Sequence, residues 1–171
     1  MEDKVRKFRN VAHFLAVEVD GFIAEYKNEK WVNLHGDLSA LEFYLTDLES
    51  EALKSMWDGR FVSLSLRGIA KRAMRGYIFR GGNNISANAL ANQMTDLYAR
   101  KNRDYGNSFD KSMDKFGLVV AAIRIGDKVN RLQSLVAKRG EAEVKDESLA
   151  DTFMDLACYS IMTMLWLHDK K

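Results

Sequence analysis

The feature that most constrains the fold is the absence of proline from a chain of 171 residues. Proline interrupts helices, because it lacks an amide hydrogen and its ring clashes with the preceding turn. Long helices are therefore permitted along the whole chain. Residues of high helix propensity are frequent, and long alternating runs of β-branched residues are missing. We expect an all-α fold, arranged as a helical bundle.

Composition excludes several classes of protein. Hydrophobic residues make up 47% of the chain, which is sufficient for a packed core and excludes a disordered chain. The net charge of +2 excludes a polybasic or an acidic tail. The single cysteine, Cys158, cannot form an internal disulfide, which indicates a reducing compartment. We find no signal-peptide pattern and no apolar run long enough to cross a membrane, so we expect a cytoplasmic protein.

The spacing of apolar residues predicts where the helices lie. Between Leu118 and Val136, apolar positions recur at intervals of three and four, as in a helix with one buried face. An interruption is expected near Gly76, and a loop at 104–109. Residues 20–36 fit either short strands or a turn. The predicted helices cover residues 2–19, 37–57, 61–80, 86–102, 115–138 and 146–168.

Acidic residues recur along the last predicted helix. Glu147, Asp151 and Asp155 are four residues apart, so their carboxylates line one side of the helix. An unpaired charge among the apolar neighbours of Asp155 would be costly, and Mg²⁺, which prefers oxygen ligands, would compensate for it. Alternatively, these acids face solvent or pair with basic residues, while Asp146 or Ser148 only caps the helix.

The preceding helix carries a second polar edge. Arg124, Asp127, Lys128 and Arg131 lie three or four residues apart, beside the apolar stripe. Asp127 would complete a metal site, and Lys128 or Arg131 would hold phosphate oxygens. The structural alternative is an exposed Asp127–Arg131 ion pair, which contributes only ~0.3–0.5 kcal/mol.

A third polar element precedes these two helices: the predicted loop region KNRDYGNSF, residues 101–109. Gly106 permits a tight turn, Tyr105 can stack on a base, and neighbouring polar side chains can bind phosphate or sugar. An equally simple alternative is a polar turn between helices, with Tyr105 anchored in the core.

Residues 60–95 contain basic side chains and no acidic one, and the basic residues lie within 60–80. Such a segment can attract nucleotide phosphates, nucleic acid or an acidic partner. It can equally pair with the acid-rich helix predicted over 37–58. The basic residues are Arg60, Arg67, Lys71, Arg72, Arg75 and Arg80.

Three motifs occur in order: KNRDYGNSF, then RIGDKVNRL at 124–132, then DESLADTFMDLACY at 146–159. Together they resemble the nucleotide modification associated domain of type one. That family is frequent in bacteriophages and is related to the all-α, MazG-like nucleoside triphosphate pyrophosphohydrolases. The resemblance covers about residues 88–168. It divides the chain into a mainly helical region of unknown role, 1–85, and a MazG-like nucleotide-associated domain, 86–171.

The resemblance implies a MazG-like helical bundle that hydrolyses a canonical or modified (deoxy)nucleoside triphosphate to monophosphate and pyrophosphate. It implies Mg²⁺, with Mn²⁺ as a substitute, and a homodimer in the cytoplasm, or in the host cytoplasm for a phage protein. By the same resemblance, Asp127, Glu147, Asp151 and Asp155 would hold the metal, and all of these except Glu147 would be catalytic. The implied substrate-binding residues are Lys101, Asn102, Asp104, Tyr105, Arg124, Lys128 and Arg131.

The chain departs from the wider superfamily at two places. Arg124 and Asp127 occupy the spacing where two glutamates are usual, and Thr152 lies where a glutamate is common. A site with fewer acids would bind fewer ions, or would bind nucleotides without cleaving them. The alternative function is therefore a noncatalytic accessory protein that binds nucleotide, nucleic acid or a protein partner.

Overall fold

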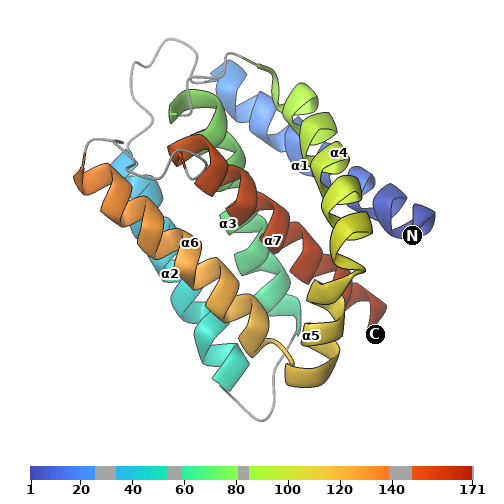
Figure 1. Ribbon diagram of the computed structural model, residues 1–171. Coiled ribbons are helices and arrows are strands. Elements are labelled where there is room, and N and C mark those ends of the chain that lie inside the picture. The colour runs from blue at the N-terminus through green and yellow to red at the C-terminus, as the bar shows by residue number, and fades with distance from the viewer. Residues whose placement is uncertain (26–33, 54–58, 81–84, 139–147, 171) are drawn as a thin grey trace.

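The computed structural model describes residues 1–25, 34–53, 59–80, 85–138 and 148–170. Within these ranges it consists of seven helices and no strand, which confirms the all-α prediction (Figure 1). None of the described helices is both long and apolar enough to cross a membrane. The helices are α1 (Glu2–Glu25), α2 (Leu34–Leu53), α3 (Gly59–Arg80), α4 (Ala87–Tyr105), α5 (Ser108–Phe116), α6 (Val119–Ala137) and α7 (Leu149–Asp169).

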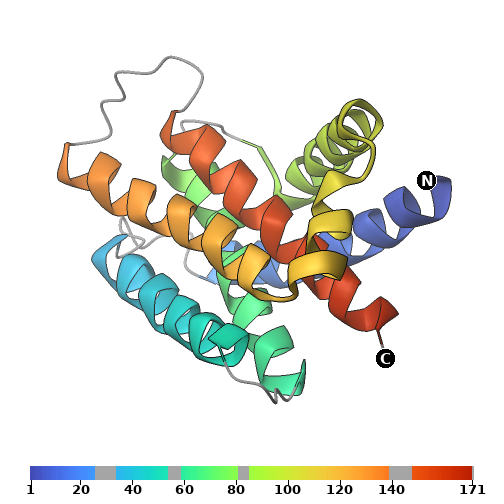
Figure 2. The same ribbon diagram turned by 60° about the horizontal axis from the view of Figure 1, so that its bottom comes forward.

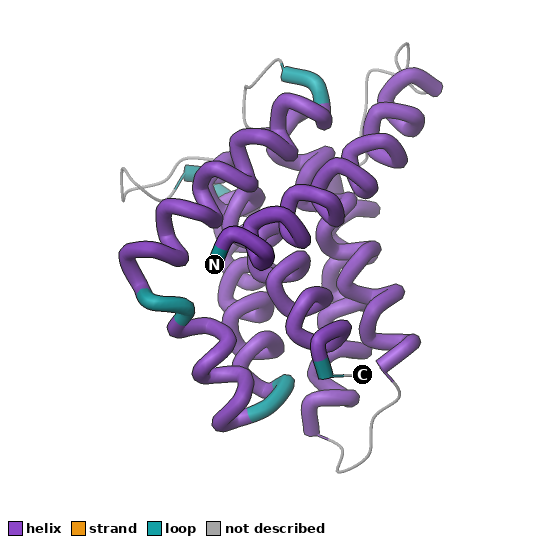
Figure 3. The backbone as a smooth tube through the Cα atoms, turned by 90° about the vertical axis from the view of Figure 1, so that its right-hand side faces the viewer, coloured by secondary structure: helices purple, strands orange, loops and turns teal. Residues whose placement is uncertain are grey.

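Helices α3 and α7 pack against each other along the middle of the molecule. The pair α2 and α6 covers one side of them, and the pair α1 and α4 covers the other (Figures 1 and 2). The backbone tube in Figure 3 shows the same bundle of helices from the side. Buried hydrophobic residues of 1–85 and of 86–171 belong to one continuous core. The division of the chain at residue 85 stays a prediction.

Several predicted features are confirmed by burial and capping. Leu118, Ala122, Ile125, Val129 and Leu132 are all buried, as the periodicity of α6 indicated. The side chain of Ser86 accepts a hydrogen bond from the Ala89 amide, so Ser86 caps α4 where the predicted helix 86–102 begins. The Phe8 ring stacks on the Tyr98 ring, with centroids 4.4 Å apart, and this contact joins α1 to α4.

The expected interruption near Gly76 is wrong, because α3 is continuous to Arg80. Gly76 is instead a point of close approach between helices. A Cβ atom at this position would lie 2.3 Å from Cε1 of Phe153 on α7. The glycine therefore makes room for an aromatic ring between α3 and α7.

Two other expectations differ from the structure. Helix α1 continues to Glu25, so Phe22 and Ile23 are helical, whereas Trp31 and Val32 lie outside the described residues. The predicted loop at 104–109 is a shorter break, because α4 reaches Tyr105 and α5 begins at Ser108. Helix α5 escaped prediction because it has only nine residues, although Phe109 and Met113 have helical spacing.

Four basic residues of α3 pair with acidic residues of other helices. Arg67 and Lys71 contact Glu18 of α1 at 2.8 and 3.3 Å. Arg75 and Arg72 contact Asp37 of α2 at 3.2 and 3.9 Å, as expected if the segment pairs with the acid-rich helix. Glu18 is an additional partner, from outside that helix. Nucleic-acid binding through residues 60–80 stays a prediction.

Candidate functional site

A cavity of about 200 Å³ lies between the end of α4, the start of α5 and the middle of α7. We call it the α4–α7 pocket. Apolar and aromatic side chains form much of its lining, and cationic, acidic, amide and hydroxyl groups complete it. The lining residues are Leu97, Tyr98, Lys101, Asn102, Tyr105, Ser108, Phe109, Asp155, Cys158, Tyr159 and Met162.

Local geometry at the end of α4 brings three polar residues to the pocket. Gly106 has a left-handed conformation, with φ of 58°, and its amide bonds to the Asn102 carbonyl. A left-handed residue after a helix satisfies the last carbonyl groups and ends the helix, which glycine does at little cost. Lys101, Asn102 and Tyr105 therefore stand on the final turn of α4, directly before α5.

Asp155 of α7 is held by two lysines from two other helices. The Lys101 ammonium, on α4, lies 3.2 Å from one carboxylate oxygen, and the Lys128 ammonium, on α6, lies 3.2 Å from the other. Asp155, which was predicted to lie among apolar neighbours, is thus paired with two lysines rather than isolated. Two ammonium groups against one carboxylate leave a net positive charge at this cluster, which we call the Asp155 cluster.

The Asp155 cluster affects the pKa of Lys101. Burial is the largest influence and lowers this pKa, because it disfavours the charged form. The charge and hydrogen bond of Asp155, together with Cys158 and Tyr159, outweigh burial and leave the pKa of Lys101 raised. Lys101 is therefore a cation at neutral pH, and about half of its side chain is exposed.

Aromatic rings offer flat surfaces for a ligand. Tyr105 is 68% exposed, so it is not anchored in the core, which was the structural alternative for this residue. The Phe109 and Tyr159 rings contact each other across the pocket, with centroids 5.6 Å apart and planes inclined by 45°. A planar heterocycle can stack on such rings.

Cys158 also lines the pocket, yet its thiol is not a nucleophile. Burial, and secondarily the Asp155 charge, raise its pKa to about 12, so the thiol is neutral at physiological pH. Cys158 is a buried residue of the hydrophobic core.

The other predicted metal ligands lie in different surroundings. Asp151 forms a capping box with Ser148: the Ser148 amide donates to its carboxylate at 3.0 Å, and its own amide donates to the Ser148 hydroxyl at 3.1 Å. Asp127 is exposed and lines a separate groove between α2 and α6, beside Glu49. Glu147 lies outside the described residues.

Of the predicted substrate-binding residues, the structure brings together Lys101, Asn102 and Tyr105 at the pocket, with Lys128 joined through Asp155. Asp104 and Arg124 are exposed and are absent from the pocket lining, and Arg131 is half-buried and likewise absent. Their roles stay predictions.

The described residues contain no group of three or more histidine, cysteine or acidic side chains that could hold a metal ion. Among the described residues that line the α4–α7 pocket, Asp155 supplies the one carboxylate. Nucleotide sites commonly hold Mg²⁺ through one or two carboxylates together with phosphates and water. This donor set fits a Mg²⁺ ion that a phosphate chain shares with Asp155. The metal site of four carboxylates that the family resemblance implies stays a prediction, because Glu147 lies outside the described residues.

Sequence reasoning missed part of the pocket lining, although a signal for it was present. Leu97 precedes Lys101 by four residues on α4, and Tyr159 follows Asp155 by four residues on α7. Residues four apart share one helix face. A search four residues before or after each polar candidate, on the same face of its helix, would have identified Leu97 and Tyr159.

Residues 101–167 match the family model of nucleotide modification associated domain 1. This segment is a nucleotide modification associated domain. The resemblance drawn from the three motifs is confirmed over these residues. The matched segment begins at Lys101 within α4, contains α5 and α6, and includes every pocket residue except Leu97 and Tyr98. Neither the search of curated proteins nor that of solved structures gives a match to the chain.

Proposed function

We propose that the chain binds a nucleotide in the α4–α7 pocket, with its phosphates at Lys101 and Lys128 and its base against the aromatic rings. The observation that carries this proposal is the Asp155 cluster beside an aromatic-lined cavity. Phosphate oxygens form strong charge-assisted hydrogen bonds with lysine and would compete with Asp155 for both ammonium groups. Lysines already gathered at one point lose little freedom on binding an anion.

The start of α5 supports the same orientation of the ligand. Ser108 and Phe109 line the pocket in the first turn of this helix, and the Asn107 side chain forms no capping hydrogen bond. Amide groups at a helix start favour anions, because the helix dipole and the free N–H groups act together. The phosphates would therefore lie between Lys101 and the first turn of α5.

We further propose that the ligand is a canonical or modified (deoxy)nucleoside triphosphate, which the protein hydrolyses to monophosphate and pyrophosphate in phage-type nucleotide metabolism. The relation of this family to MazG-like pyrophosphohydrolases supports this reaction, as does the carboxylate at the pocket. Bound Mg²⁺ would neutralise phosphate charge and activate a water molecule. Asp155 is the pocket residue that would hold it. The homodimer that the family resemblance implies is part of the same proposal.

The test combines binding and turnover on one panel of nucleoside triphosphates. Calorimetry in EDTA measures binding, and malachite green with added pyrophosphatase measures pyrophosphate release in Mg²⁺. We expect Lys101→Ala to weaken binding and Asp155→Ala to abolish release. Asp96→Ala is the matched control, because Asp96 is exposed on α4 and does not line the pocket. A folded wild-type protein that binds no nucleotide would refute the proposal.

A second candidate function is noncatalytic nucleotide binding by an accessory protein. The specific observation in its favour is that both oxygens of Asp155 are engaged by lysines. Binding to the panel in EDTA, combined with no pyrophosphate release in Mg²⁺ or Mn²⁺, would establish this function in place of hydrolysis.

A further inference from the structure

Helix α5 is a short wall of the α4–α7 pocket with few buried contacts of its own. Ser108 and Phe109, at its start, line the pocket, and Met113 is its one fully buried side chain. It packs chiefly against α6, the next helix in the chain. Figure 1 shows α5 at the edge of the bundle, between the end of α4 and the start of α6.

Left-handed residues stand at both ends of α5. Gly106 and Asn107 precede it, with φ of 58° and 59°, and Gly117 follows it, with φ of 72°. No other part of the described structure lies within 4 Å of the Cβ position of either glycine. Glycine adopts a wide range of backbone angles at little cost, so each junction contains a residue that can serve as a hinge.

Side-chain contacts at the far end of α5 hold it against α7. The Trp166 indole donates a hydrogen bond to the Asp114 carboxylate at 2.9 Å, and the Lys170 ammonium lies 2.8 Å from the same oxygen. Asp114 does not line the pocket. It follows Phe109, a pocket residue, by five positions on the same helix.

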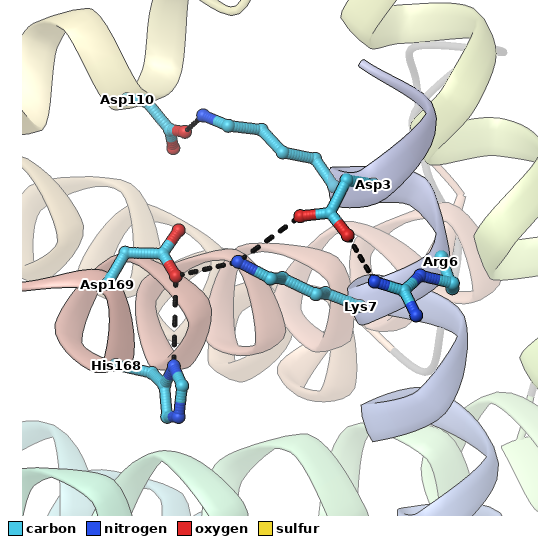
Figure 4. A network of polar contacts seen from close by, with 7 residues as sticks. Asp3, Arg6, Lys7, Asp110, His168 and Asp169 are labelled. Atoms are coloured by element: carbon cyan, nitrogen blue, oxygen red, sulfur yellow. Dashed lines mark hydrogen bonds and ion pairs between the residues drawn. The ribbon is translucent and has the colours of Figure 1, made fainter.

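A second contact joins α5 to α1. The Lys4 ammonium pairs with Asp110. Figure 4 shows Asp110 beside the ion pairs that join the start of α1 to the end of α7, where Lys7 lies between Asp3 and Asp169. Besides the apolar contacts of Met113 and Phe109, α5 is attached to α1 and α7 by polar side-chain contacts, which stabilise weakly and release readily.

We infer that α5 is a hinged wall of the nucleotide pocket, and that Asp114 is the positioning residue that keeps this wall closed without touching the ligand. The inference rests on the proposed nucleotide binding. Release of Asp114 from Trp166 and Lys170 lets α5 turn about Gly106–Asn107 and Gly117. Phe109 then separates from Tyr159, and the pocket opens for entry and exit of the nucleotide.

The test uses the full chain with Asp114→Ala, and Asp96→Ala as a control that removes one exposed acid elsewhere. Calorimetry in EDTA titrates each common deoxynucleoside triphosphate separately. We expect Asp114→Ala to raise Kd about fivefold or more, because a smaller fraction of the protein is closed. The control should stay within about twofold of wild type. Hydrogen exchange over 108–116 should be faster in Asp114→Ala than in wild type or in Asp96→Ala.

A readout from Trp166 separates positioning from general destabilisation. In wild-type protein, nucleotide should shift the ¹H–¹⁵N resonance of the Trp166 indole, which Trp166→Phe identifies by its loss. Trp166→Phe retains an aromatic ring and removes the N–H donor, so it serves as a second variant if Asp114→Ala does not fold. It should also raise Kd and speed exchange over 108–116.

The outcomes distinguish the two proposals. If wild type binds a nucleotide and both variants bind it as Asp96→Ala does, the hinged wall is refuted and the proposed function stands. Unchanged exchange over 108–116 in both variants also refutes it. If wild type binds no nucleotide, both proposals fail.

Discussion

The Lys101 ammonium lies 3.2 Å from the Asp155 carboxylate, although 54 residues separate the two in the chain. Lys128 contacts the other oxygen of this carboxylate, so one acid joins α4, α6 and α7 beside the pocket. The same arrangement would give a bound phosphate two cations and one repelling charge. Binding and hydrolysis should therefore respond in opposite directions when Asp155 loses its charge.

We expect Asp155→Asn to tighten nucleotide binding in EDTA about three- to tenfold, because removal of one charge a few ångströms away changes the interaction by ~1 kcal/mol. The same variant should lose pyrophosphate release in Mg²⁺. Calorimetry and the malachite-green assay measure the two effects. Asp96→Asn controls for net charge, and weaker binding of Asp155→Asn in EDTA would contradict the placement of phosphates at the two lysines.

The α3–α7 contact predicts opposite effects for two glycine substitutions. Gly76→Ala would press a methyl group into the Phe153 ring, and overpacking of ~1–3 kcal/mol should exceed the ~1 kcal/mol gain in helix propensity. We expect Tm to fall by about 2–6 °C. Gly21→Ala, with no neighbouring atom within 4 Å, is the matched control and should raise stability by ~0.5–1 kcal/mol. Calorimetric melting checks both, and an unchanged Tm for Gly76→Ala would show that Phe153 moves aside freely.

The thiol of Cys158 should resist alkylation in the folded protein. Burial raises its pKa to about 12, and only the thiolate reacts rapidly. Iodoacetamide at pH 8 should label the native protein far more slowly than protein unfolded in urea, as mass spectrometry will measure. Rapid labelling of native protein would show that the pocket opens deeply enough to hydrate Cys158.

The contact between Asp114 and Trp166 predicts a pH dependence. The hydrogen bond of Lys170, followed by that of Trp166, lowers the pKa of Asp114 below its ordinary value of 3.8. A lowered folded-state pKa means that the contact is fully present above 3.8 and is lost as pH falls through the folded value. The Trp166 indole resonance should stay constant from pH 7 to about 5 and move only in stronger acid. Movement above pH 5 would contradict an ionised Asp114 as the acceptor.

The helices were largely predictable because their signals are local. The regular spacing of apolar residues in α6 and the cap at Ser86 depend on residues within a few turns. The close approach at Gly76 was not predictable, since it involves Phe153, which lies on a helix distant in the sequence. Helix α5 was missed because nine residues contain too few periods for a clear pattern.

The candidate site was likewise predictable where its signals are local and unpredictable where they depend on distant residues. Lys101, Tyr105 and Asp155 stood out by residue type and motif, and they lie at one pocket. Spacing alone placed Asp151 and Asp155 on one helix side, but it could not show that Asp151 caps α7 while Asp155 faces two lysines. Pairing between side chains of different helices depends on tertiary structure, which a single sequence does not encode locally.

The packing of α3 on α7 affects how small a working unit can be. The segment that matches the family model starts at Lys101, yet Phe153 on α7 packs against α3, which precedes that segment. A truncated chain that keeps only residues 101–167 would expose the hydrophobic face of α7 to water and would aggregate. A natural protein reduced to that stretch would need replacement helices, or a companion polypeptide, to shield the same surface.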